Sequence, residues 1–213
     1  ETETVPIFGS MGRTLAAAVA ARVAMPPFTQ SAMDGYALAA GDGLPSGSRL
    51  DVVDRIAAGS VGKRVLEGKA SRLFTGAPLP DGADAVVMQE HVAREGNTII
   101  LGRPIRAGDN VRYRGEDIEP LEPLLGAGER LDARHIALLA AQGIDRVDVR
   151  VRARVAVIST GDELRQPGAG LEAAAIYDSN RPMLLALIAQ AGLIAIDGGC
   201  VPDDASRLSA CMR

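Results

Sequence analysis

The spacing of turn-forming residues is the feature that most constrains how this chain can fold. Between residues 49 and 118, glycine, proline, aspartate and asparagine separate four short β-prone runs: LDVVDRIAAG, SRLFTG, AVVMQEHV and NTIILGRPI. Such runs are typical of strands joined by short connections, and Glu95-Gly96-Asn97 predicts a hairpin turn between two of them. The pattern therefore predicts a small, mostly β domain over residues 26–118.

The segments on both sides of this β region have helical patterns. Residues 10–24 are rich in alanine, contain no proline and predict a helix that the two following prolines end. Residues 131–143 predict a second helix, with Asp132 as its N-cap and a glycine just past its last turn. We assign residues 1–25 and 119–150 to a helical linker region.

Past residue 150 the rhythm becomes α/β. Residues 152–160 form a near-continuous apolar run, which is typical of a strand covered on both faces. Asp178 or Ser179 can cap a following helix, whose predicted apolar face is Leu184, Leu187 and Ile188, and residues 193–196 form the next strand. Because a doubly wound domain needs about four to six strands, residues 151–213 are expected to be an incomplete α/β domain.

Composition and charge exclude several kinds of partner. The net charge of −4 gives no basic face for nucleic acid and no polybasic membrane patch. No apolar run reaches the ~20 residues that span a bilayer, and the first residues lack the pattern of a signal peptide. Cys200 and Cys211 have no further ligands to complete a zinc set and are expected as free thiols. We therefore expect a cytoplasmic protein. Its core is expected to be aliphatic, because aromatic residues make up only 3% of the chain.

Five loops carry polar residues that strand and helix periodicity do not explain. They are QSAMDGYAL with Asp34, FTGAPLPDGAD with Thr75, VRYRGEDI with Asp117, VISTGDEL with Glu163 and IYDSNRP with Asp178. A single aspartate before glycine is typical of an Asx turn, in which the side chain caps its own backbone. Five such loops in one chain favour a shared function instead.

In this order, the five loops resemble those of the molybdopterin molybdenumtransferase family, the MoeA proteins and the E region of gephyrin. The resemblance covers residues 26–204, with Gln30 in place of the family's asparagine and Phe74 in place of its methionine. It implies an α/β and mostly-β multidomain protein: a helical linker region, a small β domain and the truncated start of an open α/β domain of the molybdopterin-binding type. Family members continue beyond this point with a glycine-rich loop and a C-terminal β domain.

The resemblance also implies a function and partners. It implies a transferase of molybdenum cofactor biosynthesis that inserts molybdate into adenylylated molybdopterin, releases AMP and uses Mg²⁺. It implies a homodimer, and a molybdopterin adenylyltransferase as partner. The chain on its own is expected to have little activity. The alternative is a molybdopterin-binding or scaffold module without turnover, because gephyrin-type relatives also organise partners.

Residue roles carry over where this chain matches the family's motifs. Molybdate and a pyrophosphate repel each other, so their reaction needs N–H donors, a cation or both. Mg²⁺ is commonly held by one or two carboxylates with phosphate and water, so Asp34 and Glu163 are assigned as metal ligands. Both are also assigned as catalytic, together with Thr75 and Asp117. The candidate cofactor-binding residues are Thr160, Gly161, Asp178, Ser179, Asn180, Gly76, Arg112 and Arg114.

Local chemistry leaves alternatives open for several of these residues. Glu163 follows a strand, where open α/β sheets bind ligands, but it could also cap a turn. Thr75 could hydrogen-bond an oxyanion or end a strand in an ST turn. Arg112 and Arg114 alternate on an expected strand, where they form either an anion patch or an ordinary solvated face.

Overall fold

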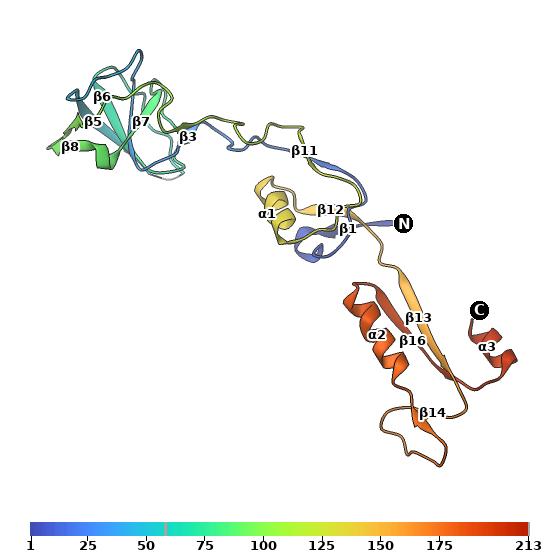
Figure 1. Cartoon of the computed structure of the whole chain (residues 1–213). Coiled ribbons are helices and arrows are strands. Elements are labelled where there is room, and N and C mark those ends of the chain that lie inside the picture. Colours follow the sequence, from blue (N-terminus) through green and yellow to red (C-terminus); the bar gives the residue numbers. More distant parts are fainter. Residues whose placement is uncertain (58, 213) are drawn as a thin grey trace. The chain divides into compact units, whose positions relative to one another are not determined.

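The computed structural model describes residues 1–57 and 59–212 and divides the chain into two compact units. One unit is Ala20–Leu124, and the other combines Glu1–Val19 with Leu125–Arg213. The fold is mostly β, with three α-helices in the described part of the chain (Figure 1). No helix among these residues is long and apolar enough to cross a membrane.

The first unit is built on a six-stranded sheet. β5 and β6 are parallel, whereas every other neighbouring pair is antiparallel. Glu95 pairs with Thr98 across a two-residue turn, which confirms the predicted hairpin. In sheet order the strands are β7 (Ala85–Met88), β4 (Gly35–Leu38), β6 (Lys69–Leu73), β5 (Arg49–Ile56), β9 (Thr98–Leu101) and β8 (Val92–Glu95). Along the chain, the 3-10 turn η2 (Gln89–His91) connects β7 to β8.

β4 lies between β7 and β6 in this sheet, and every one of its residues is buried. Alternate side chains point to opposite faces, so Tyr36 and Leu38 join one apolar cluster and Ala37 joins another. Apart from Tyr36, both clusters are aliphatic, as the low aromatic content predicts. The sheet is therefore anchored on both sides of the strand that follows Asp34.

The predicted helix over residues 10–24 is wrong. A short 3-10 turn, η1 (Ile7–Gly9), precedes this segment, which consists of turns, bends and short β pairings. Leu15 donates its backbone N–H to Glu129, and Ala16 donates to Asp148. These pairings with distant residues outweigh the helix propensity of alanine, which is a weak preference of less than about 1 kcal/mol per residue.

Several two-stranded sheets lie outside the six-stranded sheet. β3 (Gln30–Ser31) is antiparallel to β10 (Val111–Arg112), and β2 (Val19–Ala20) pairs with β11 (Pro123–Leu125). In the second unit, β1 (Thr2–Pro6) is antiparallel to β12 (Arg146–Arg150).

The second predicted helix is confirmed as α1 (Ala133–Ala141). Asp132 caps it by accepting hydrogen bonds from the backbone N–H groups of Arg134 and His135, while the His135 ring accepts from the N–H of Asp132. Gly143 follows the last turn with φ +66°, as predicted.

This cap makes the stability of the second unit depend on pH. The Arg134 guanidinium, with the two backbone donors, lowers the pKa of Asp132 from 3.8 to about 2. A carboxylate whose pKa is lowered by folding stabilises the fold fully above its unfolded pKa and ceases to do so as pH falls through its folded pKa. Above pH 3.8 the unsubstituted protein should therefore have a higher free energy of unfolding than Asp132→Asn, by an amount that does not change with pH. This difference between the two proteins should vanish toward pH 2.

Urea unfolding followed by far-UV circular dichroism measures this difference, because asparagine still caps a helix and only the charge is removed. Asp145→Asn, at an exposed position outside the cap, is the matched control. A difference that stays constant down to pH 2 would contradict the assignment.

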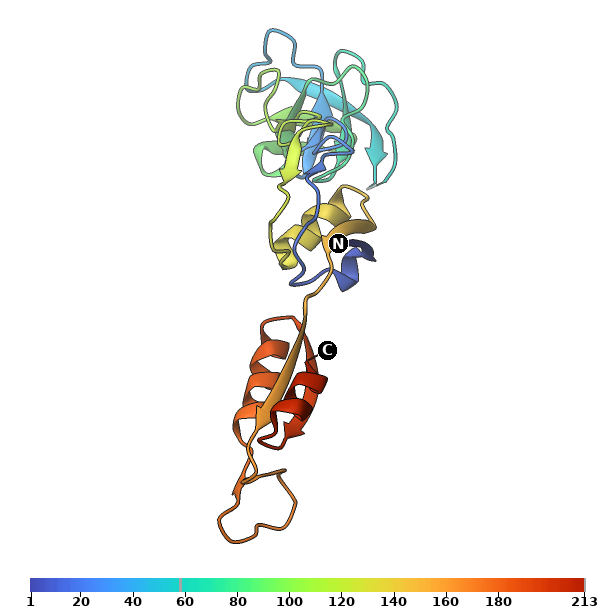
Figure 2. The ribbon, with the colours of Figure 1, turned by 90° about the vertical axis from the view of Figure 1, so that its right-hand side faces the viewer.

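The remaining elements form a strand, helix, strand unit, as predicted. β13 (Arg154–Thr160) runs parallel to β16 (Ile194–Val201), and α2 (Asn180–Gln190) connects them. α2 packs against both strands, and α3 (Ala205–Cys211) packs against β16 (Figure 2). β14 (Leu164–Arg165) and β15 (Ile176–Tyr177) form a short parallel pair in the connection.

Burial in this unit differs from the prediction. β13 is not covered on both faces, since only Val157 of its residues is buried. In α2, Leu185 and Ile188 are half-buried, whereas Leu184 and Leu187 of the predicted apolar face are 43% and 51% exposed. Two strands present too little surface to cover a helix that is apolar on several sides.

Candidate functional site

Strand register brings Asp34 and Thr75 together in the β unit. β4 and β6 are antiparallel with Gly35 opposite Leu73, so Asp34 lies close to Phe74 and Thr75, which follow Leu73. Asp34 Oδ1 accepts hydrogen bonds from the Thr75 backbone N–H at 2.8 Å and from the Thr75 hydroxyl at 2.9 Å. Gly35 is required here, because a Cβ would lie 2.0 Å from the Val87 carbonyl oxygen.

These contacts keep the Asp34 carboxylate ionised. Its pKa is lowered mainly by the Thr75 N–H, then by the Thr75 hydroxyl, and further by the charge of Arg72. In the described part of the chain, no protein donor bonds the second oxygen, Oδ2. An ionised carboxylate with one oxygen available is a suitable ligand for Mg²⁺.

Gly76 lies beside this pair and takes part in the same local structure. It has φ +79°, which favours glycine, and its N–H donates to the Ser31 carbonyl at 2.9 Å. Ser31 in turn donates its N–H to Ala77. The Gly76 amide is therefore occupied by the protein and holds the Thr75 loop against β3.

The structure pairs the predicted basic residues with acids. Arg112 Nη2 bonds both carboxylate oxygens of Asp117, at 2.6 and 2.5 Å. Arg114 lies 3.6 Å from Glu119. The expected alternation on one strand is wrong, because β10 ends at Arg112 and Arg114 belongs to the following turn. β3 also holds the loop after β10 in place, because Arg112 of β10 pairs with Gln30 of β3.

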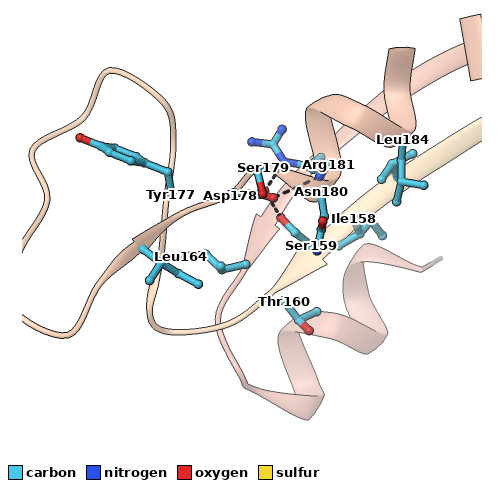
Figure 3. Close-up of a pocket in the computed structure, with 12 residues that line it drawn as sticks. Ile158, Ser159, Thr160, Leu164, Tyr177, Asp178, Ser179, Asn180, Arg181 and Leu184 are labelled. Carbon is cyan, nitrogen blue, oxygen red and sulfur yellow. Dashed lines mark hydrogen bonds and ion pairs between the residues drawn. The ribbon is translucent and has the colours of Figure 1, made fainter. Parts of the chain in front are cut away.

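A pocket of about 260 Å³ opens in the second unit, beside the carboxyl end of β13 and the N-terminus of α2 (Figure 3). In open α/β sheets ligands bind at the carboxyl ends of the strands, and helix N-termini favour anions. Four predicted cofactor-binding residues line it: Thr160, Asp178, Ser179 and Asn180. The other lining residues are Val157, Ile158, Ser159, Leu164, Ile176, Tyr177, Arg181 and Leu184.

One wall of this pocket is fixed by an ionic network around two buried residues, Asp178 and Arg181. Asp178 is 3% exposed and accepts hydrogen bonds from the Ser159 hydroxyl at 2.6 Å and from Arg181 Nε at 2.9 Å. Its Oδ1 also accepts from the Arg181 backbone N–H, so Asp178 rather than Ser179 caps α2. The Ser159 hydroxyl and then the Arg181 N–H lower the pKa of Asp178.

Arg181 completes the network by bonding Asp197 on β16. It is 5% exposed and holds two acids that come from separate segments of the chain. Because three hydrogen bonds already engage the Asp178 carboxylate, Thr160, Ser179 and Asn180 are the predicted residues with polar groups more suited to a ligand. Arg181 and Asp197 were missed as supporting residues.

Glu163 and Gly161 follow β13. Glu163 is exposed, and no hydrogen bond or ion pair engages its carboxylate in the described residues. Gly161 has φ +153° and donates its N–H to the Val201 carbonyl at 3.3 Å. A Cβ at residue 161 would lie 2.6 Å from Glu163 Oε2, so the glycine lets the carboxylate fold back over the backbone.

No group of three or more histidine, cysteine, aspartate or glutamate residues that could hold a metal occurs in residues 1–57 and 59–212. Asp34 and Glu163 belong to different compact units. Cys200 and Cys211 are free thiols, as expected.

The chain combines two features. Its β unit carries the Asp34–Thr75 pair, and its other unit carries a pocket between a strand and a helix N-terminus. Together they define a multidomain protein with a polar site in each unit. Residues 1–143 match the family model described as MoeA N-terminal region (domain I and II), and residues 156–213 match a probable molybdopterin binding domain. The chain therefore belongs to the MoeA family.

Relatives and solved structures agree with this membership. The chain is 39% identical over 213 residues to a molybdopterin molybdenumtransferase of Nostoc sp., covering 98% of this chain and 49% of the relative. It is 35% identical to molybdopterin molybdenumtransferase 2 of Mycobacterium tuberculosis, with coverage of 97% and 52%. A MoeA protein structure from Pyrococcus horikoshii superposes with a TM-score of 0.90 at 35% identity, covering 100% of this chain and 58% of that one. The chain thus spans about half the length of the curated relatives it matches.

Proposed function

We propose that the complete gene product containing this chain is a molybdopterin molybdenumtransferase, which inserts molybdate into adenylylated molybdopterin and releases AMP. The observation that carries the proposal is the Asp34 carboxylate, which two bonds from Thr75 hold ionised while one oxygen stays available. Family membership and the names of the relatives supply the substrate class.

The proposal gives each part of the chain a role. Asp34 and Glu163 would hold Mg²⁺, which when bound offsets the charge of the substrate's phosphates. Thr75 orients Asp34, and Asp117 holds Arg112 in place. Thr160, Ser179 and Asn180 would bind the anionic cofactor at the N-terminus of α2, on a wall that Asp178 fixes.

The proposed enzyme also has a defined domain organisation and assembly. We assign residues 1–25 and 119–150 to a linker region, 26–118 to the β domain and 151–213 to the α/β domain. A homodimer in the cytoplasm that receives its substrate from a molybdopterin adenylyltransferase belongs to the same proposal, as does low activity of residues 1–213 alone.

The test is a turnover assay on the complete gene product with adenylylated molybdopterin, molybdate and Mg²⁺. We expect AMP release in a fixed ratio to formed cofactor, measured by chromatography and by reconstitution of a molybdenum enzyme that lacks its cofactor. Both signals should be lost when EDTA removes the metal, and cofactor formation should be lost when molybdate is omitted. Tight substrate binding with no AMP release above a protein-free blank would overturn the proposal and favour a binding or scaffold module.

A further inference from the structure

The Arg72 side chain joins three segments around the Asp34 loop. Its Nη1 donates to the Gly35 carbonyl at 2.8 Å and to the Leu73 carbonyl at 2.7 Å. Its Nη2 donates to Gln89 Oε1 in η2. Gly35 directly follows Asp34, and Gln89 donates its own backbone N–H to the Asp34 carbonyl. The guanidinium therefore bonds the β4 and β6 strand ends and η2, which itself bonds the backbone of Asp34.

Two aromatic rings hold this guanidinium in place. It lies 4.6 Å from the centre of the Phe74 ring and 5.3 Å from that of Tyr36, which is its cross-strand partner. A guanidinium is planar, so it can stack on a ring while its edge donates several hydrogen bonds in fixed directions. A lysine ammonium at this place keeps the charge but cannot reproduce that set of bonds.

We propose that Arg72 is a positioning residue of the Asp34 site, which fixes the ends of β4 and β6 so that the Asp34 carboxylate meets Thr75. Its hydrogen bonds to Gly35, Leu73 and Gln89 carry this role, and its charge adds a smaller effect on Asp34. The geometric part of the proposal is independent of the reaction. The effect on turnover rests on the proposed function.

Arg55 provides a matched control on the same ring. It is the register partner of Arg72 on β5, and its guanidinium lies 5.2 Å from the centre of Phe74. In the described residues its side chain bonds no carbonyl of the Asp34 or Thr75 loops. Arg55→Lys therefore makes the same chemical change beside the same ring, without removing the bonds that join the loops.

The experiment compares Arg72→Lys with Arg55→Lys in the complete gene product. Hydrogen–deuterium exchange at the Thr75 amide reads the bond to Asp34 directly and needs no turnover. We expect Arg72→Lys to speed this exchange by about tenfold while the amides of β4 and β7 stay protected, because a local opening leaves the core intact. Arg55→Lys should change exchange at Thr75 by less than about twofold.

Steady-state kinetics gives the second readout. Arg72→Lys should lower kcat by about tenfold with KM nearly unchanged, because misplacing a catalytic group costs transition-state stabilisation and not ground-state binding. Unchanged exchange at Thr75 in Arg72→Lys would overturn the proposal. So would equal loss of protection at Thr75 and throughout β4, which would mean a general loss of stability. If the unsubstituted gene product shows no turnover, the proposed function fails, whereas the exchange result still decides the role of Arg72.

Discussion

Asp34→Asn is expected to lower the rate of AMP release from adenylylated molybdopterin by about 100-fold or more, a loss typical of removing one key polar group from a reaction site. Asparagine has the same shape, and its carbonyl oxygen can still accept both bonds from Thr75. The substitution therefore removes the negative charge that would hold a cation and leaves the loop in place. The measurement is the initial rate in the complete gene product at saturating substrate, molybdate and Mg²⁺.

Two controls make this result interpretable. Asp42→Asn removes an exposed carboxylate of the same unit and should leave the rate within about twofold, as surface substitutions usually do. Exchange at the Thr75 amide should be unchanged in Asp34→Asn, which would show that the loop is intact. A rate within threefold of the original would make Asp34 an ordinary turn residue and would remove the main support for the metal assignment.

Leu73→Ala should lower the free energy of unfolding by about 3 kcal/mol. This loss lies within the range for leucine truncation in a well-packed core. The Leu73 side chain is fully buried at the end of β6. Its cluster contains Ala37, Ile56, Ala77 and Val86, and most of these side chains are too small or too constrained to fill the space. Urea unfolding of the complete gene product, followed by a probe in the β unit, measures the loss.

Val53→Ala on β5 is the comparison for this prediction. It removes two methyl groups from a side chain of the same sheet that is 50% exposed, and should cost less than about 0.5 kcal/mol. Leu73→Ala should also increase exchange at Thr75, since residue 73 lies two positions before it. Equal small losses for both variants would show that the cluster around residue 73 is loosely packed.

Much of the fold was predictable because its signals are local. Turn residues mark the ends of β5, β6, β7 and β9, and an N-cap with a glycine two residues past the last turn marks α1. Residues 10–24 were mispredicted for the opposite reason. Their non-helical path depends on hydrogen bonds to residues 129 and 148, which no local pattern reveals.

The candidate sites divide in the same way. Asp34, Thr75 and Asp178 were named as candidates because they lie on loops that periodicity does not explain and that resemble the family's motifs. Arg72 was missed, because on a half-buried strand it looks like any alternating polar residue. Arg181 was missed because it looks like a surface residue of a helix, whereas the fold surrounds it with Asp178 and Asp197.

The sequence by itself determined the main β runs, α1, the strand, helix, strand unit, the loops that carry polar residues and the resemblance to one family, because caps, turns and alternation act over about four residues. Only the tertiary structure decided that Thr75 bonds Asp34, that Arg112 is taken by Asp117 and that Arg181 is buried. These outcomes depend on strand register and on which distant segments meet. Register follows from the packing of whole sheets, so no single segment contains it.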